Sequence, residues 1–333
     1  MSLRLAVVGA TGLVGETLLD ILGSRKALPE ALYLVASQQS AGEILDVGNK
    51  PFEVQSLEDF DFSLVDVAIF SAGEAVAKQY ASKAIKAGCT VIDNSSAFRY
   101  DDDVPLVIPE VNGERLKTIV RPCVIANPNC STIQMLMAIH PLRALAKLER
   151  IDVATYQSVS GAGRDALNEL VMETRALLNM QSYTRKVFPK QIAFNMIPHI
   201  DAFQDNGYTR EEMKMVWETR KIFADETIEV NPTAVRVPAF YGHAEVLHLR
   251  FASPVSAELA TERLKKALGV KVLDRRKDGG YPTQVGDASG SDDVFVGRIR
   301  NDLNNPCGLN LWVVADNLRK GAALNALQIA ERL

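Results

Sequence analysis

The sequence of 333 residues predicts an α/β protein: a doubly wound parallel sheet followed by an α+β region with a mixed sheet. Up to residue 129, short apolar runs that end in Gly or Ser alternate with helical patterns, as in parallel sheets. Beyond that point the runs are longer and rich in β-branched residues, with clearer alternation of apolar and polar positions. A hydrophobic content of 47% in a chain of this length supports two domains rather than one.

The first region begins with an apolar run at residues 3–10 that is typical of a strand buried on both faces. Leu13, Thr17, Leu18 and Ile21 then recur at helical spacing and predict a helix over residues 11–25. Further strands of the same sheet are predicted at residues 31–37, 65–73 and 89–98.

The second region contains strand patterns at residues 150–163, 234–240, 243–251, 288–303 and 308–316. In the third of these, Leu247, Leu249 and Phe251 share one face, whereas His248 and Arg250 share the other. We therefore expect two domains, 1–129 and 130–315, and an amphipathic helix over residues 316–333 that packs back on the first domain.

The composition excludes several classes of protein. A net charge of −4 and a pI near 5.7 provide no global positive field for nucleic acid or a membrane surface, so an anionic substrate would need local Arg and Lys residues. The chain has no apolar run long enough to span a bilayer, and its start, MSLRLAVVGATG, has no signal-peptide pattern. Four cysteines form no disulfide framework, and neither they nor the histidines have the spacing of a metal site. These features indicate a cytoplasmic protein.

A glycine turn connects the first strand to the first helix. The sequence GATGLVG places Gly9, Gly12 and Gly15 in a G-x-x-G-x-x-G spacing instead of the commoner G-x-G-x-x-G. Small residues let the backbone approach a pyrophosphate, which then lies at a helix N-terminus. An ordinary tight turn can carry the same glycines, but the position of this one favours a Rossmann-like dinucleotide-binding domain.

The end of the second strand bears on the choice of dinucleotide. An acidic residue there would bind the ribose 2′-hydroxyl of NAD and repel a 2′-phosphate. This strand instead leads into Ser37, Gln38, Gln39 and Ser40, which are uncharged. Nothing here repels NADP, and no cation attracts it.

Cys130 lies in the segment NPNCST, residues 127–132, between two apolar runs. Pro128 restricts the preceding chain, and the remaining residues are of types that cap or open helices. A thiol in the first turn of a helix faces backbone N–H groups and the positive end of the helix dipole, which lowers its pKa. The segment therefore predicts a nucleophile that is active at neutral pH.

The other three cysteines have a simpler interpretation. Cys89 and Cys123 adjoin apolar strands, and Cys307 lies in a Pro-Gly turn, so all three fit the buried structural role that is usual for cysteine. Cys130 does not fit that role, because capping residues surround it.

A thiolate of this kind needs an acid–base partner. His243 follows a glycine at the start of a strand, where an imidazole can project into a cleft. His248 lies on the polar face of that strand, and His140 and His199 have structural surroundings. The residues by themselves leave the choice among these four histidines open.

Several long motifs then occur in one order along nearly the whole chain: GATGLVG, VIDNSSAFR, PEVN, IANPNCST, YQSVSGAG, NGYTREEMKM, RVPAFYGHAE and DNLRKGAALNA. Together they make the chain similar to the aspartate-β-semialdehyde dehydrogenase family, and their wording resembles its USG-type branch. The resemblance implies a Rossmann domain, a catalytic domain that also forms a dimer interface, and a role in amino-acid biosynthesis. It also implies NADP-linked phosphorylating chemistry, in which an aldehyde and phosphate become an acyl phosphate through a cysteine thioester.

The resemblance also implies roles for individual residues. Cys130 matches the nucleophile, His243 the acid–base group and Gln157 the glutamine that orients the reacting centre. The implied substrate contacts are Arg236 to the α-carboxylate, Glu211 near the amino group, and Arg99 and Lys214 to phosphate. The implied cofactor contacts are Gly9, Thr11, Gly12, Leu13, Val14, Gln39, Ser40, Ser160, Gly161 and Asn317. No metal and no nucleic-acid or membrane partner is implied, and the expected assembly is a homodimer or a dimer of dimers.

The sequence also departs from the family pattern. Family members commonly have an Arg-Ser pair after the second strand for the 2′-phosphate of NADP, where this chain has Gln39-Ser40, so NAD becomes possible. Ala234 stands where a cysteine is frequent, and GHAEV replaces the usual GHSEA.

The sequence motifs are consistent with three functions. The first is aspartate 4-semialdehyde dehydrogenation, and the second is a weak or inactive USG-type paralogue with a binding or assembly role. The third is a relative that reduces another acyl phosphate, as N-acetylglutamyl-phosphate reductases do. Glu211 beside Lys214 would suit a substrate with a free amino group and argues against the third.

Overall fold

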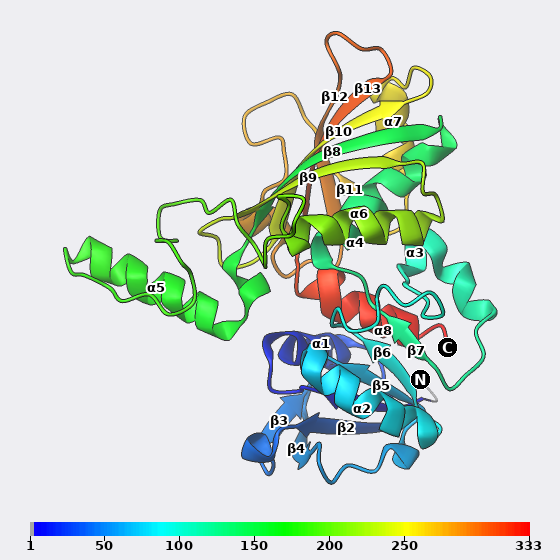
Figure 1. Cartoon of the computed structure of the whole chain (residues 1–333), viewed down its shortest axis with the longest axis vertical. Helices are drawn as coiled ribbons and strands as arrows, with labels where there is room; N and C mark the ends of the chain where they lie inside the picture. Colours follow the sequence, from blue (N-terminus) through cyan, green and yellow to red (C-terminus); the bar gives the residue numbers. More distant parts are fainter. Residues whose placement is uncertain (1–2) are drawn as a thin grey trace. The chain divides into compact units, whose positions relative to one another are not determined.

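The computed structural model describes residues 3–333, and the chain forms two compact units. The first runs to Asn129 and takes up again at Ala322–Leu333, and the second is Cys130–Gly321 (Figure 1). Among residues 3–333, no helix combines the length and apolar character needed to cross a membrane.

Within the described part of the first unit, a seven-stranded sheet has the order β3-β4-β2-β1-β5-β6-β7. All neighbouring pairs are parallel except β3–β4, a hairpin that the sequence patterns did not predict. The predicted parallel sheet is thus confirmed. Its strands are β1 (Arg4–Val8), β2 (Ala31–Ala36), β3 (Ile44–Val47), β4 (Lys50–Ser56), β5 (Val67–Phe70), β6 (Thr90–Asp93) and β7 (Val124–Ala126).

The strand order of this sheet reverses at β1, which lies between β2 and β5. In open α/β sheets, ligands bind beyond the carboxyl ends of the strands at such a point. Gly9 lies there with a φ of +88°, and a Cβ on it would be 2.9 Å from the carbonyl carbon and oxygen of Ser71, which follows β5. Only glycine fits both the dihedral angle and the space.

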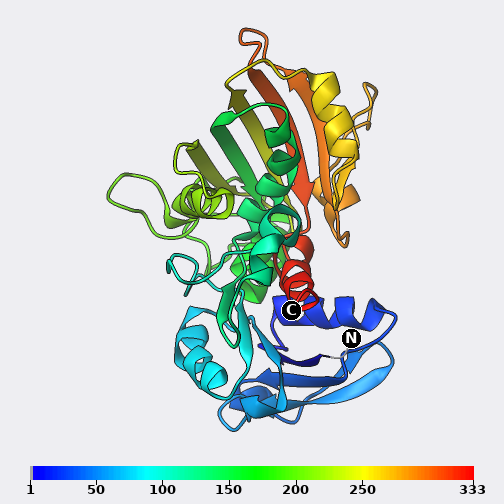
Figure 2. The same ribbon diagram turned by 90° about the vertical axis from the view of Figure 1, so that its right-hand side faces the viewer.

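Helices cover both faces of this sheet (Figure 2). Helices α1 (Leu13–Ser24) and α8 (Leu324–Ala330) share one apolar core with the strands, and α2 (Glu74–Lys86) packs in a second core on the other side. The short helix α3 (Pro109–Asn112) precedes β7.

The C-terminal segment differs from the predicted helix over residues 316–333. The α-helix covers only Leu324–Ala330 and follows a π-helical segment, η7 (Arg319–Ala323). Residues up to Gly321 belong to the second unit, because side chains such as Asp316 are bonded there: its carboxylate accepts hydrogen bonds from the N–H groups of Gly290 and Leu318 at 2.7 and 2.9 Å.

Helix α8 is also buried around nearly its whole circumference, because every residue in it except Gln328 is buried. Asn325 is fully buried and donates hydrogen bonds to the Val107 carbonyl and to the Asn127 side chain at 3.0 and 2.7 Å. A fully buried polar side chain of this kind does not fit the amphipathic helix that the sequence pattern predicted.

The second unit contains a six-stranded sheet with the order β11-β12-β13-β10-β8-β9. The pairs β8–β9 and β11–β12 are parallel and the others are antiparallel, which confirms the predicted mixed sheet. The strands are β8 (Leu148–Gln157), β9 (Glu229–Arg236), β10 (His243–Phe251), β11 (Val270–Val272), β12 (Val294–Asn301) and β13 (Gly308–Ala315).

The two faces of this second sheet differ in burial. On β10, Leu247, Leu249 and Phe251 are at most 1% exposed, and we call their side of the sheet the inner face. Helices α4 (Cys130–Ile139) and α6 (Arg210–Phe223) pack on this side, and α7 (Ala257–Lys265) packs on β11 and β12. His248 and Arg250 lie on the opposite, outer face, as predicted, and are half-buried.

Helix α5 (Arg164–Leu178) and the loop that follows it form an arm that projects from the sheet of this unit (Figure 1). Two buried carboxylates attach the loop to the helix. Glu169 accepts hydrogen bonds from the N–H groups of residues 186–188 at 2.6 to 2.9 Å, and Glu173 accepts them from Ile192 and Ala193. A buried carboxylate surrounded by backbone donors fixes a loop that has little apolar packing of its own.

Candidate active site

Three predicted site residues form one row across the second sheet. Gln157 at the end of β8 pairs with Arg236 at the end of β9 on one side, and with His243 at the start of β10 on the other. Residues in register on neighbouring strands project from the same face. All three are at most 5% exposed, on the inner face. The sheet thus brings together residues that are far apart in the sequence.

Cys130 is the first residue of α4, which packs against the inner face. The prediction that this thiol lies at the start of a helix is confirmed, and the thiol is half-buried. A Cβ on Gly321 would lie 2.9 Å from the Cβ of Cys130, so any other residue at 321 would displace the cysteine. The charge of the Cys130 thiolate acts on the Arg236 guanidinium, which places the two groups in one site.

The surroundings of His243 determine which ring nitrogen carries the proton. The backbone N–H of Ser158 donates to Nδ1 at 3.1 Å, and an N–H group can only donate. A neutral imidazole at this position therefore has its proton on Nε2. In the described part of the chain Nε2 is buried and has no hydrogen-bond partner, so it can donate a hydrogen bond to a bound substrate.

The imidazole of His243 is neutral at physiological pH. Complete burial lowers the pKa of His243 to about 3, and the neighbouring Arg236 guanidinium acts in the same direction. The ring is therefore able to donate a hydrogen bond from Nε2 at neutral pH.

Arg236 and Gly161 define the space in front of this imidazole. Nη1 of Arg236 donates to the Ser158 carbonyl at 2.7 Å, and burial lowers the pKa of Arg236, while Glu211 and Cys130 oppose the shift. A Cβ on Gly161 would lie 2.9 Å from this Nη1 and 3.3 Å from Nε2 of His243. The absence of a side chain at 161 leaves that space open.

Glu211 and Lys214 lie in the first turn of α6. The Glu211 carboxylate accepts hydrogen bonds from Gln157 at 3.2 Å and from Lys214 at 2.9 Å, and Lys214 also donates to Asp201 at 2.9 Å. Burial by itself lowers the pKa of Lys214, but the two carboxylates outweigh it and the pKa is raised. The helix begins with a capping box between Thr209 and Glu212. Glu211 is 6% exposed, so this charged run is not a solvated helix face.

Asn317 connects three segments of the site. Its Oδ1 accepts hydrogen bonds from the hydroxyls of Ser158 and Ser160 at 3.1 and 3.2 Å, and from the N–H of Gly242 at 2.9 Å. Gly242 immediately precedes His243. Asn317 thus fixes the loop and the imidazole relative to each other.

The glycine turn of the first unit has the geometry of a phosphate cradle. A Cβ on Gly15 would lie 2.2 Å from the Gly9 carbonyl oxygen, so α1 approaches the turn closely. Gly12 caps α1 without any side-chain hydrogen bond, so the cap itself leaves room for an anion at the helix N-terminus. Thr11, Leu13 and Val14 are partly exposed around it. These residues fit a dinucleotide pyrophosphate.

Gln39, Ser40 and Arg99 also belong to the first unit. Gln39 and Ser40 lie in a 3₁₀ turn, η1 (Gln38–Ser40), directly after β2, and Gln39 is exposed. Arg99 is 6% exposed and donates from Nη2 to the Asn94 carbonyl at 3.1 Å.

The remaining cysteines and histidines have structural surroundings. Burial raises the pKa of Cys89 to about 12, as expected for an inert thiol. His140 stacks on Phe223 and His199 on Phe203, with ring centroids 6.3 and 4.3 Å apart.

Sequence reasoning missed three contributors to this site: Ser158, which sets the tautomer of His243; Asp201, which binds Lys214; and Gly321, which makes room for Cys130. Ser158 and Gly321 lie inside the long motifs YQSVSGAG and DNLRKGAALNA. Their position in these motifs could have marked both residues as candidates for the site. No sequence motif marked Asp201, because its ion pair with Lys214 depends on the loop conformation, in which Asp201 itself has a positive φ of 69°.

Comparison with known proteins defines the class. The family model described as "Semialdehyde dehydrogenase, NAD binding domain" matches residues 4–119, and the one described as "Semialdehyde dehydrogenase, dimerisation domain" matches residues 139–320. The chain is therefore built from the two domains of the semialdehyde dehydrogenases, with an NAD(P)-binding domain followed by a dimerisation domain.

Relatives that match over their full length identify the family within the semialdehyde dehydrogenases. The chain is 55% identical over 331 residues to the aspartate-semialdehyde dehydrogenase of Legionella pneumophila, covering 99% of this chain and 95% of the relative. It is 52% identical over 330 residues to aspartate-semialdehyde dehydrogenase 2 of Vibrio cholerae, covering 99% and 97%. The chain belongs to the aspartate-semialdehyde dehydrogenase family.

Solved structures agree with this assignment. A crystal structure of aspartate semialdehyde dehydrogenase II from Vibrio cholerae complexed with ASA has a TM-score of 0.97 at 51% identity, covering 100% of this chain and 98% of that one. The enzyme from Candida albicans, solved with NADP, has a TM-score of 0.78 at 26% identity, covering 100% and 98%.

Proposed function

We propose that this chain converts L-aspartate 4-semialdehyde and phosphate into 4-phospho-L-aspartate, with NADP as hydride acceptor, and catalyses the reverse reaction. The observation that carries the proposal is the in-register row of Arg236, Gln157 and His243, with the Cys130 thiolate acting on the same guanidinium. A nucleophile, a hydrogen-bond donor and a carboxylate-binding cation are thereby collected in one site.

In the proposed reaction, the Cys130 sulfur attacks the aldehyde carbon and forms a hemithioacetal. The Nε2–H of His243 donates to the oxygen on which negative charge develops. The bound dinucleotide supplies the oxidising power by accepting the hydride from that carbon. Phosphate then attacks the resulting thioester, the C–S bond breaks, and the Cys130 thiolate is released with the acyl phosphate as product.

The substrate's charged groups have matching partners in the site. The planar Arg236 fork suits the α-carboxylate, and Glu211 suits the ammonium group. Lys214 would bind the phosphate, a role that the family resemblance also implies for Arg99. Lys214 already interacts with two carboxylates, so its charge is held in place before phosphate arrives.

The cofactor preference depends on the end of β2. Ser40 can donate a hydrogen bond to a 2′-phosphate, but Gln39 provides no positive charge there. We therefore expect NADP to be used with a weak preference over NAD.

Steady-state kinetics test the proposal. Purified protein is assayed with the semialdehyde, phosphate and either dinucleotide, and activity must depend on phosphate and exceed that of Cys130→Ala. Gln39→Arg should lower the KM for NADP by roughly ten-fold and leave that for NAD unchanged, because a guanidinium binds phosphate but not a hydroxyl-bearing ribose. Gln181→Arg, an exposed position on the arm, is the charge-matched control.

The alternative of a USG-type paralogue without useful turnover rests on Gln39 and on the wording of the sequence motifs. Thermal denaturation distinguishes it, because a ligand that binds only the native state raises the midpoint. Midpoints unmoved by NADP, NAD and phosphate, together with no turnover, would establish that reading.

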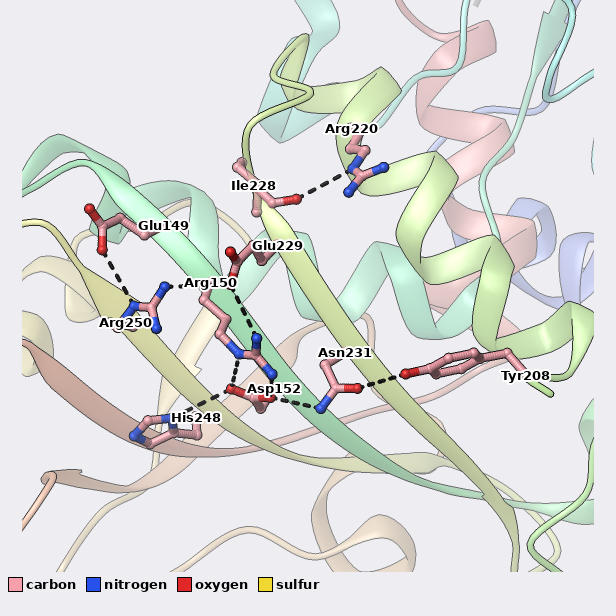
Figure 3. A network of polar contacts seen from close by, with 10 residues as sticks. All are labelled: Glu149, Arg150, Asp152, Tyr208, Arg220, Ile228, Glu229, Asn231, His248 and Arg250. Atoms are coloured by element: carbon pink, nitrogen blue, oxygen red, sulfur yellow. Dashed lines mark hydrogen bonds and ion pairs between the residues drawn. The ribbon is translucent and has the colours of Figure 1, made fainter. Parts of the chain in front are cut away.

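We also propose a homodimer, in which a second copy covers the apolar side chains of the arm. Leu178, Met180 and Phe194 on the arm are 71%, 98% and 68% exposed, which is unusual for large apolar side chains outside an interface. The outer face of the second sheet instead carries a partly exposed network of ion pairs between Arg150, Asp152, Glu229 and Arg250 (Figure 3) and lies outside this interface. Sedimentation of Leu178→Asp against wild type tests this, with a lighter species expected.

A further inference from the structure

Glu245 is a buried acid for which the proposed reaction has no use. It lies on β10 two residues after His243 and projects from the same inner face. Its exposure is 0%, and in the described part of the chain neither carboxyl oxygen has a hydrogen-bond donor. An ionised carboxylate in this position would carry a large desolvation cost.

Within residues 3–333, no cation forms an ion pair with Glu245. Its register partners are Thr155 on β8 and Val313 on β13, and His243 is the nearest titratable group on its own strand. Gln134 on α4 lies within hydrogen-bonding reach of the carboxyl. Burial raises the pKa of Glu245 well above its ordinary value, and the nearby Gln134 amide opposes only part of that shift.

Gln134 lacks a hydrogen-bond donor for its side-chain oxygen within the described chain. Its Nε2 donates to the His243 carbonyl at 3.5 Å, whereas its buried Oε1 has no donor in the described structure. A carboxylate cannot supply one, but a protonated carboxyl can. One proton on Glu245 therefore removes the buried charge and satisfies Oε1 at the same time.

We propose that Glu245 is a positioning residue: as a neutral carboxylic acid it donates to Oε1 of Gln134, which in turn donates to the His243 carbonyl. Gln134 follows Cys130 by four residues and lies on the same side of α4. This chain of hydrogen bonds connects helix α4, which begins at Cys130, to strand β10, which begins at His243. Two residues that never touch the substrate set the distance between the reacting groups.

The activity readout of this inference rests on the proposed function, so the test includes two measurements that do not need turnover. Infrared difference spectroscopy should show the carbonyl band of a protonated carboxylic acid in wild type at neutral and mildly alkaline pH. The band should be absent in Glu245→Gln and present in Glu212→Gln, since Glu212 is a carboxylate that accepts hydrogen bonds from the N–H groups of Thr209 and Ala234. A wild type without the band would overturn the proposal.

Stability gives the second independent measurement. Below pH 4.5 Glu245 is protonated in both the folded and the unfolded chain, but above it only the unfolded chain releases the proton, so wild type loses stability as the pH rises. Glu245→Gln lacks this loss. Its stability relative to wild type should increase with pH from about 4.5 upward, and a pH-independent difference would contradict a neutral Glu245.

Kinetics then test the positioning role. Glu245→Gln keeps a donor for Oε1 and should retain kcat within about three-fold. Glu245→Met and Gln134→Met have no such donor or acceptor, so kcat and the alkylation rate of Cys130 should fall about ten- to a hundred-fold with KM nearly unchanged. The double variant should be no worse than either single one. Equal impairment of Glu245→Gln and Glu245→Met, or wild-type behaviour of Glu245→Met, would overturn the role. If the Met variants do not fold, the infrared and stability results decide.

Discussion

The two faces of the six-stranded sheet carry similar residue types in opposite electrostatic states. On the outer face, Arg150 forms a two-point ion pair with Asp152, with both distances 2.8 Å, and a further one with Glu229 at 3.1 Å (Figure 3). These contacts raise the pKa of Arg150 and lower that of Asp152, so each charged form is stabilised.

On the inner face the shifts have the opposite direction. Burial lowers the pKa values of Arg236 and His243 and raises that of Glu245, so the charged form of each group is less stable there than in water. The difference arises because the inner face is covered by α4 and α6, whereas water and ion partners reach the outer face. Alternation along one strand thus separates a reactive surface from a solvated one.

The largest effect should come from the nucleophile on the inner face. Replacing Cys130 by Ser should lower kcat by at least about 10⁴-fold, because the covalent route is lost. The equivalent change at Cys307, which is half-buried in a turn of the same unit, should leave kcat unchanged. Equal loss in both variants would point to general damage rather than nucleophilic catalysis.

An Arg-to-Lys exchange compares the two faces directly. Arg236→Lys should reduce kcat/KM for the semialdehyde about a hundred-fold, since a buried fork geometry is replaced by a single ammonium group. Arg250→Lys, on the half-exposed outer face, should change it by less than about two-fold. Similar losses at both positions would remove the proposed distinction between the faces.

Acid should destabilise the protein through the inner-face imidazole. Below pH 6.5 the unfolded chain binds a proton at His243, whereas the folded chain does not until about pH 3, so stability decreases as the pH falls through this window. Between pH 6.5 and about pH 5 the loss should be roughly 2 kcal/mol. Chemical denaturation of His243→Gln should show a correspondingly smaller pH dependence, and an unchanged one would mean that the ring is protonated in the native state.

The smallest effect is expected on the outer face. Asp152→Asn should lower the free energy of unfolding by no more than about 1 kcal/mol, because a partly exposed ion pair is screened by solvent. The loss should shrink as salt is added. A larger, salt-independent change would indicate that the outer face is as desolvated as the inner one.

Much of the fold could be predicted because short-range sequence patterns determine its strands and turns. The strand run at residues 243–251 separates buried Leu249 from half-exposed His248, and the glycines of GATGLVG occur where a close approach requires them. The β3–β4 hairpin and the buried Asn325 were missed, since neither has a local signal that distinguishes it from its alternatives. Motif resemblance named Cys130, His243, Gln157 and Arg236, and their roles stay predictions until they are measured.

By itself, the sequence determined the parallel and mixed sheets, the phosphate-binding turn and a cysteine at a helix start, because each depends on neighbouring residues and on the short-range geometry of strands and helices. Only the tertiary structure decided which histidine lies in register with Gln157 and beside Arg236, which nitrogen of that histidine carries the proton, and that Glu245 lies near Gln134. Those outcomes depend on strand register and on the exclusion of water between distant segments, which no local pattern encodes.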